Sequence, residues 1–448
     1  MVIVYLLISI ILIIFLTSRL KIHPFIVLLL VALVFGLIAG MPLDLIIQSV
    51  NDGFGETLGK IGLIIVLGIV IGAFLENSGG AYAIARTVLR LIGEKRVTKA
   101  MGIIGYLVSI PVFADSGFIL LSPINKSLSK KAGISLAGSA VALGLGLTAT
   151  HTLVPPTPGP IAAAGILGAD LGLVLLFGLM VSAFAMIPAL FFANRFASKT
   201  YIDPNPEIKS TESENNDKDR PSAFKSSLPV MIPILLILLR SVIKSLNSDI
   251  NSFFFRLISF IGEPVIALLI GMFLALLLPK KFSFKMLSGS GWVGKAMKDA
   301  ASIVLITGAG GIFGKVLQNS GIAEQLGERL AEVNLSIWLP FFLAAVIKTA
   351  QGSSTVALIT AASIMLPMMG TLGFETELQK ALVVVAIGTG SAVFSHANDS
   401  FFWVVTQLSG MDVKTGYRLY STGTFILGTS GALFLFVCHL FICKIGLV

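Results

Sequence analysis

Two acidic residues and one lysine stand inside long apolar segments of the chain, at Asp115, Asp399 and Lys348. A charge at the centre of a bilayer costs about 2.5–3.5 kcal/mol on insertion scales, so such a residue usually has a partner or a function. Lys348 precedes a Gly/Ser-rich interruption at 351–355. The free N–H groups of a helix that starts there, together with the ammonium, would suit a carboxylate. The structural alternative is that Lys348 reaches the outer interface or pairs with a buried Asp.

The two acids also have two interpretations. Burial disfavours the ionised form of a carboxyl group, which fits a residue that carries a proton. An Asp at the start of a half-helix can instead simply cap its free N–H groups. His396 and Asn398 adjoin Asp399 and can form hydrogen bonds with substrate hydroxyls. We therefore expect proton coupling at Asp115 or Asp399, and hydroxyl recognition beside Asp399.

The remaining candidates are polar residues at other interruptions of the apolar segments. The further substrate-binding candidates are Gln351, Gly352, Ser353, Ser354, Thr355, Ser116 and Thr157. The secondary candidates are Asn77, Asn319 and His151. The two asparagines are interpreted mainly as helix caps and His151 mainly as structural. No cofactor other than a co-transported proton is expected, and Cys438 and Cys443 show no metal-ligand pattern.

Two patterns point to other kinds of chemistry. Ser354, His396 and Asp399 admit an intramembrane hydrolase, but a catalytic triad is recognised by geometry, and Ser354 lacks the G-x-S-x-G motif. The glycine-rich run 308–314 resembles a dinucleotide loop only superficially, because the third glycine is misplaced. Small residues in an apolar helix favour close helix packing instead. Neither pattern is therefore the preferred interpretation of these residues.

The overall composition is that of a membrane protein. Of 448 residues, 55% are hydrophobic and 12% charged, with a mean hydropathy of +0.95. Soluble proteins carry about 25% charged residues. Apolar stretches of about 17–25 residues recur, each long enough to cross a bilayer. Basic cytoplasmic loops account for the net charge of +9, so the expected partners are a lipid bilayer and a small carboxylate, with no nucleic acid.

The chain repeats itself after 242 positions. Residues 76–79 (ENSG) match residues 318–321 (QNSG), and two further pairs of glycines are in the same register. A polar stretch with the composition of a disordered linker separates the copies. We expect a first repeat at 1–200, a cytoplasmic linker at 201–226 and a second repeat at 227–448.

Each repeat is predicted to hold about five transmembrane helices, one of them broken, and a re-entrant hairpin. Pro, Gly and polar residues interrupt the apolar stretches of hairpins at 100–124 and 336–368, and of broken spans at 132–169 and 380–408. An odd number of crossings inverts the second repeat relative to the first. Inverted repeats with paired broken helices are typical of secondary transporters.

Charged residues predict the orientation of the spans. Asp44, Asp52 and Glu56 are expected in an external loop, whereas the basic residues of 86–99 and 280–298 are expected in cytoplasmic loops. This arrangement places the N-terminus outside the cell.

Three motifs, at 306–317, 350–357 and 395–403, resemble the gluconate permease family of gluconate:proton symporters, and the resemblance covers nearly the full length. It implies proton-coupled uptake of small hydroxy acids, and kinship with a wider ion-transporter superfamily built on paired hairpins and often dimeric. Members usually have Arg where Lys348 stands, and gluconate-type members often have His where Thr157 stands. Lysine lacks the bidentate fork of arginine, so the carboxylate geometry is expected to differ. Thr157, together with Asp115 and Ser116, makes a shorter acid such as glycerate an alternative substrate.

We therefore predict an all-α polytopic protein of the bacterial inner (plasma) membrane that imports gluconate or a similar small hydroxy acid by proton symport. The carboxylate would lie on Lys348 and at 351–355, and the hydroxyls on Thr157, Asn398 and His396. The alternatives are a carrier of D-serine or another carboxylate, a sodium-coupled carrier or an exchanger and, remotely, the hydrolase. A homodimer is a further possibility.

Overall fold

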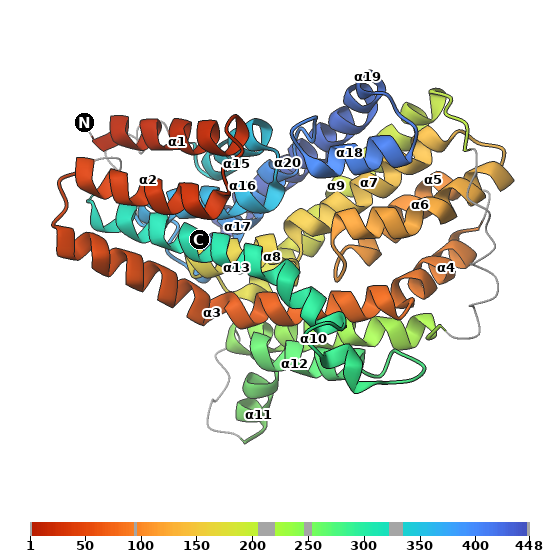
Figure 1. Ribbon diagram of the computed structural model, residues 1–448, viewed down its shortest axis with the longest axis horizontal. Helices are drawn as coiled ribbons and strands as arrows, with labels where there is room; N and C mark the ends of the chain where they lie inside the picture. The colour runs from red at the N-terminus through yellow and green to blue at the C-terminus, as the bar shows by residue number, and fades with distance from the viewer. Residues whose placement is uncertain (1, 94–95, 205–219, 246–252, 322–334, 446–448) are drawn as a thin grey trace.

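The computed structural model describes residues 2–93, 96–204, 220–245, 253–321 and 335–445, and within them it is all-helical (Figure 1). The helices of the first half are α1 (Val2–Ser18), α2 (Pro24–Ile38), α3 (Leu43–Asn77), α4 (Gly80–Ile92), α5 (Val97–Val108), α6 (Ala114–Lys131), α7 (Leu136–Leu153), α8 (Pro158–Leu167) and α9 (Leu171–Arg195). Those of the second half are α10 (Ala223–Ser245), α11 (Phe253–Ile261), α12 (Pro264–Ala275), α13 (Trp292–Asn319), α15 (Trp338–Gln351), α16 (Ser354–Met365), α17 (Glu377–Ser391), α18 (Ser400–Leu408), α19 (Val413–Gly416) and α20 (Thr422–Ile445). The linker expected at 201–226 falls mostly outside the described residues.

The described helices include several that match a bilayer in length and composition. Six are long and apolar enough to cross it, namely α3, α7 continued by α8, α9, α10, α13 and α20 with the turns before it. The pair α11–α12, bent by 65°, makes a seventh if it counts as one span. Helices α1 and α2 are apolar but shorter. The sequence-based topology would use them, with the broken α17–α18, as the remaining crossings.

Helix α3 corrects the predicted external loop. It has 35 residues, or about 52 Å at 1.5 Å per residue, which exceeds the roughly 30 Å hydrocarbon core. Asp44, Asp52 and Glu56 lie on this helix rather than in a loop. The helix continues through them because one of its faces is buried at spacings of three and four residues. The buried residues of that face are Ile46, Ser49, Gly53 and Thr57.

The basic residues of 86–99 and 280–298 were also expected in loops. For part of them the expectation is wrong. Arg86 and Arg90 lie on the exposed face of α4, and Lys295 and Lys298 lie on the exposed face of the first turns of α13. The opposite face of each helix carries small residues that are buried against the protein. The charged face can therefore remain in water without a break in the helix.

Helices α3 and α13 pack against each other along a glycine contact. A Cβ on Gly53 would lie 2.6 Å from the carbonyl oxygen of Gly311, and a Cβ on Gly311 would in turn overlap the carbonyl oxygen of Gly53. Only glycine allows the two backbones this close. The close packing predicted for the run 308–314 is therefore confirmed.

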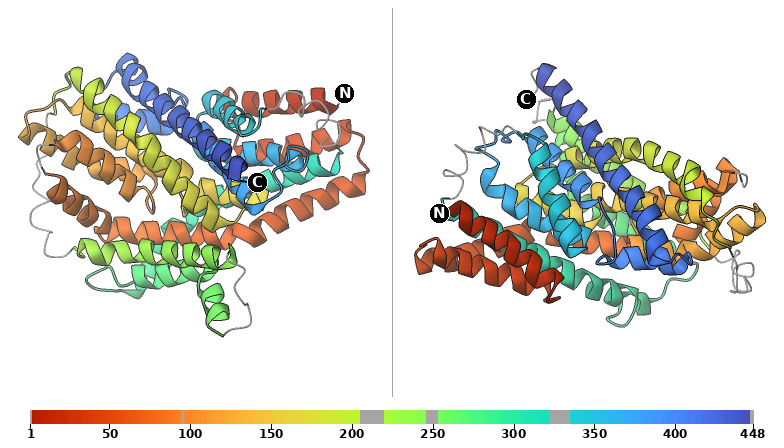
Figure 2. Two further views of the ribbon diagram at one scale, coloured as in Figure 1. Left: turned by 180° about the vertical axis from the view of Figure 1, so that it is seen from behind. Right: turned by 90° about the horizontal axis from the view of Figure 1, so that it is seen from above.

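The element order of the first half recurs in the second. A long helix (α3 or α13) is followed by a hairpin (α5–α6 or α15–α16), a broken span (α7–α8 or α17–α18) and a closing helix (α9 or α20). The four interruptions lie at 109–113, 352–353, 154–157 and 392–399, which confirms the expected hairpin and span breaks. In Figure 1 the first hairpin lies at the right of the molecule and the second lies left of its centre, and α9 and α20 pack together (Figure 2). The inverted orientation of the halves stays a prediction.

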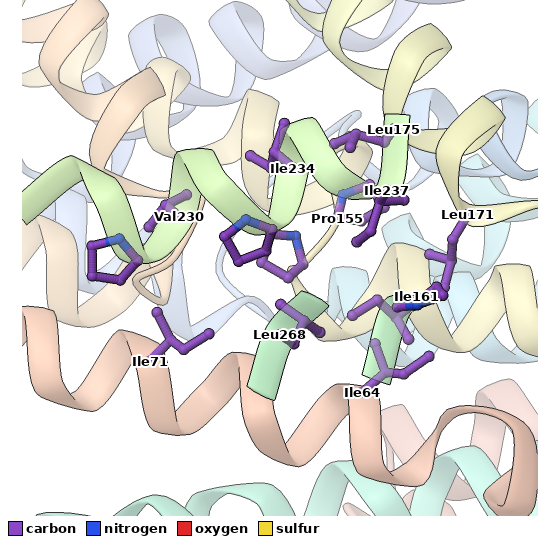
Figure 3. Close-up of a pocket in the computed structure, with 14 residues that line it drawn as sticks. Ile64, Ile71, Pro155, Ile161, Leu171, Leu175, Val230, Ile234, Ile237 and Leu268 are labelled. Carbon is purple, nitrogen blue, oxygen red and sulfur yellow. The ribbon is translucent and has the colours of Figure 1, made fainter. Parts of the chain in front are cut away.

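An apolar crevice lies where α3, α8 and α9 meet α10 and α12 (Figure 3). Its 14 lining residues are all Ile, Leu, Val or Pro. Five of them are prolines, namely Pro155, Pro156, Pro229, Pro233 and Pro264. A crevice without polar side chains offers nothing that would orient a charged ligand.

Candidate functional site

The second hairpin meets the second broken span at Gly352. Helix α15 ends there because Gly352 adopts φ +95°, in the left-handed region that favours glycine. A Cβ at this position would overlap the carbonyl oxygen of Asn398. Beyond the break, the Ser353 side chain accepts a hydrogen bond from the Val356 N–H at 3.3 Å and so caps α16. The two interruptions, at 352–353 and 392–399, are therefore in backbone contact.

Asn398 holds these two interruptions together. Its Nδ2 donates to the carbonyl oxygens of Thr349 at 2.9 Å and of Ala350 at 3.0 Å. These are carbonyls of the last turn of α15, which have no partner within the helix. The Asn398 amide, in the interruption before α18, thus satisfies the last carbonyls of α15.

A buried ion pair joins the same two elements. The Nζ atom of Lys348 lies 2.7 Å from Oδ2 of Asp399, and the side chains are 1% and 10% exposed. Lys348 also donates to the carbonyl oxygen of Gly352. Oδ2 of Asp399 accepts a second hydrogen bond from Ser395 Oγ at 2.5 Å, and Oδ1 accepts one from the Phe401 N–H at 3.0 Å. Asp399 is thus both the counter-ion of Lys348 and the N-cap of α18.

The ion pair faces a cavity of about 300 Å³ between the first hairpin, the second hairpin and the two broken spans. Nine residues proposed from the sequence line it. They are Asp115, His151, Lys348, Gln351, Ser353, Ser354, Thr355, Asn398 and Asp399. The cavity therefore combines one cation, two carboxyl groups and the capped N-terminus of a half-helix, a combination that suits a small anion with further polar groups.

Three other candidates lie beside the cavity without lining it. The carbonyl of Gly352 accepts from Lys348, as described. His396 turns away, because its Nε2 donates to the Thr349 carbonyl oxygen at 2.7 Å and its ring stacks on Tyr417, with centroids 6.1 Å apart. Thr157 is buried and donates to the Val154 carbonyl oxygen at 2.5 Å.

The other three candidates are at the ends of helices. Ser116 lies in the first turn of α6 near Glu76 and is not among the residues that line the cavity. Asn77 is exposed and donates to the Ala73 carbonyl oxygen of its own helix at 2.7 Å. Asn319 donates to Ser49 Oγ at 2.9 Å and so ties α13 to α3. The structure thus gives each asparagine a structural contact, within α3 for Asn77 and between α13 and α3 for Asn319.

Several cavity residues were not identified from the sequence. Thr148 lines the cavity one turn before His151, and Ser395 lines it while donating to Asp399. Phe113 and Phe401 form apolar parts of the wall. Ser395 belongs to the motif 395–403, and its position four residues before Asp399 was the one available signal.

Comparison with known proteins identifies the family. The model of the GntP family permeases matches residues 1–441. The chain belongs to this family. It is 36% identical to a gluconate permease of Pseudomonas aeruginosa, an alignment that covers 97% of this chain and 96% of that protein. It is 33% identical to the high-affinity gluconate transporter of Escherichia coli, over 95% and 96% of the two chains.

A relative with a different named substrate and one solved structure are also similar to the chain. The D-serine transporter DsdX of Escherichia coli is 33% identical, with 94% of each chain covered. Among solved structures, the YdaH transporter of Alcanivorax borkumensis superposes with a TM-score of 0.65 at 14% identity, over 94% of this chain and 99% of that one. At this identity the likeness concerns the fold alone.

Family membership decides three of the expectations drawn from the sequence. This GntP permease is a transporter and not an enzyme, and it is a multi-pass protein of the bacterial inner membrane. The hydrolase alternative therefore falls. The geometry agrees, since the Nε2 atom of His396 donates to Thr349 and the Oδ atoms of Asp399 accept from Lys348, Ser395 and Phe401.

Proposed function

We propose that this permease imports gluconate or a similar small hydroxy acid, such as glycerate, together with a proton. The Lys348–Asp399 pair carries the proposal, because it places the one lysine of the cavity wall beside a carboxylate that belongs to the protein itself. The carboxylate of a substrate would need the same ammonium.

The coupling would follow from this competition. While Asp399 is ionised it holds Lys348, and an incoming anion meets an already neutralised cation. When a proton neutralises Asp399, Lys348 is released to the substrate carboxylate, so anion and proton bind together. One proton with one monoanion is electroneutral, and a pH gradient would drive uptake at about 1.4 kcal/mol per unit.

The half-helix α16 would complete the anion site. Ser353, Ser354 and Thr355 line the cavity at its N-terminus, where N–H groups and the helix dipole favour negative charge. The charge of Lys348 and the dipole would therefore act on the same carboxylate. Gln351 and Asn398 line the cavity beside them; because the Nδ2 of Asn398 is engaged by Thr349 and Ala350, its Oδ1 would be the atom that accepts from a substrate hydroxyl.

Asp115 is the second candidate for the proton. It lines the cavity from the first turn of α6, and within the described residues no ion pair engages it. An acid in this position could alternatively receive the ammonium of an amino acid. The relative named a D-serine transporter makes such a substrate the second candidate, with the carboxylate again on Lys348.

Uptake into proteoliposomes tests the proposal. Purified permease would be given labelled gluconate or glycerate, with an imposed inward proton gradient, with a sodium gradient, or with internal unlabelled substrate. We expect the proton gradient to accelerate uptake and the sodium gradient to have no effect. Acceleration only by sodium or by internal substrate would replace symport with sodium coupling or exchange. Strong competition by D-serine against both acids would replace the substrate class.

A further inference from the structure

His151 has an unsatisfied nitrogen in an otherwise well-bonded site. Among the described residues, two side-chain polar atoms are fully enclosed without a hydrogen-bond partner, His151 Nδ1 and Thr360 Oγ1. Native structures contain few such atoms, and each calls for an explanation such as a ligand or a water. Of these two residues, His151 lines the candidate substrate cavity and Thr360 does not.

The surroundings of the imidazole leave its other nitrogen available. His151 lies on α7 with its ring centroid 6.2 Å from that of Phe113, which offers no acceptor. Thr148, one turn earlier, has its hydroxyl engaged by the Gly144 carbonyl oxygen and the Tyr420 hydroxyl, each at 2.9 Å. Within the described part of the chain His151 makes no hydrogen bond. Because Nδ1 is enclosed, Nε2 is the nitrogen left to serve the two spaces that His151 lines, the candidate substrate cavity and a small pocket beside Pro156 and Thr157.

The enclosed nitrogen also determines which tautomer the ring adopts. A neutral imidazole has one N–H donor and one bare acceptor nitrogen. An orphaned buried N–H is rarer in proteins than an under-satisfied acceptor. The proton therefore belongs on Nε2, with the bare lone pair on the enclosed Nδ1. In this tautomer the one N–H of the ring is at Nε2, so any hydrogen bond that His151 makes to a molecule in the cavity is a donated one.

We infer that His151 is a specificity-determining residue that donates from Nε2 to a hydroxyl of the bound acid. The inference rests on the proposed function and assigns the selection of hydroxy acids to one residue. Lys348 comes from α15 and His151 from α7, so the histidine would contact the carbon chain beyond the carboxylate. A hydroxyl oxygen accepts this bond, whereas a methylene group or an ammonium has no lone pair for it. The site would thus select hydroxy acids over plain fatty acids of the same length.

Binding to the purified full-length permease tests this inference with two matched pairs of acids. Gluconate is compared with hexanoate, and glycerate with propionate, by isothermal titration. We expect the wild type to prefer the hydroxylated member of at least one pair. His151→Phe should weaken that member roughly threefold to tenfold, the effect of one neutral hydrogen bond, and leave the plain acid unchanged. His151→Gln, which keeps an N–H donor, should retain most of the preference.

Thr360→Val is the matched control, because it removes the other enclosed unpartnered atom at a buried position outside the cavity wall. It should leave the preference intact. Equal weakening of both acids by His151→Phe, or no weakening of either, would overturn the role of His151 alone. A wild type that binds none of the four acids would overturn the proposed function, and this inference with it. If His151→Phe does not fold, the His151→Gln and Thr360→Val ratios decide, and a lost preference in His151→Gln refutes the assignment of a donor.

Discussion

Replacing Asp399 by Asn tests whether Asp399 and the substrate carboxylate compete for Lys348. The variant keeps the shape of the side chain but leaves Lys348, which is 1% exposed, without a counter-charge. Breaking a buried pair by removing one partner costs about 3–5 kcal/mol, because the remaining charge is uncompensated. The empty variant should therefore be less stable than the empty wild type.

A substrate carboxylate would restore the missing charge. If binding recovers about 3 kcal/mol of the loss, the affinity of Asp399→Asn for the substrate should exceed that of the wild type by roughly 100-fold. If one proton is taken up with each anion, the wild type should bind up to about tenfold more tightly for each unit by which the pH falls. The variant lacks the carboxyl group that would take up this proton, so its affinity should be the same at every pH tested.

Isothermal titration of the purified permease at several pH values measures both effects. Asp115→Asn is the matched control, because it removes the other carboxyl group of the cavity and leaves the ion pair in place. Ser395→Ala removes one hydrogen bond to Asp399 and keeps its charge. Weaker binding by Asp399→Asn at every pH would refute the competition for Lys348. Loss of the pH dependence in Asp115→Asn alone would assign the proton to Asp115.

Three further substitutions test the framework of the site. Gly352→Ala should abolish folded yield on size-exclusion chromatography, because its Cβ overlaps a backbone carbonyl; Gly373→Ala, also at positive φ but in open space, should be tolerated. Asn398→Ala should lose about 1–3 kcal/mol of stability, seen as a lower melting temperature, since the Ala350 carbonyl loses its donor and the Thr349 carbonyl keeps only that of His396. Gly311→Leu should separate α13 from α3 and reduce stability, whereas Gly59→Leu, with no neighbour within 4 Å, should be close to neutral.

The interruptions of the helices were the most predictable part of the fold. Proline and glycine break helices for local reasons, so the breaks near 155–158 and at Gly352 could be read directly from residue types. The length of α3 could not. Its acidic residues looked like a loop, and only the packing of the opposite face on α13 explains why the helix continues.

The site was partly predictable for a related reason. Ser354 and Thr355 follow a break on a regular helix, and the period of the helix determines the directions of their side chains. His396 was placed in the site because it neighbours Asp399, but side-chain directions in the irregular segment 392–399 do not follow from sequence spacing. The Lys348–Asp399 contact joins residues 51 positions apart, and the sequence offered it only as one of two alternatives.

The apolar crevice of Figure 3 affects how freely its walls can shift. Its side chains are hydrocarbon throughout, and five of its residues are prolines, which also lack a backbone N–H. Relative motion of the Pro155–Pro156 turn against α10 and α12 would therefore break no hydrogen bond between the lining side chains. Only the van der Waals packing of these side chains would oppose the motion, so the barrier would depend on side-chain shape and not on charge. Added bulk there would slow such a motion, and added salt would not.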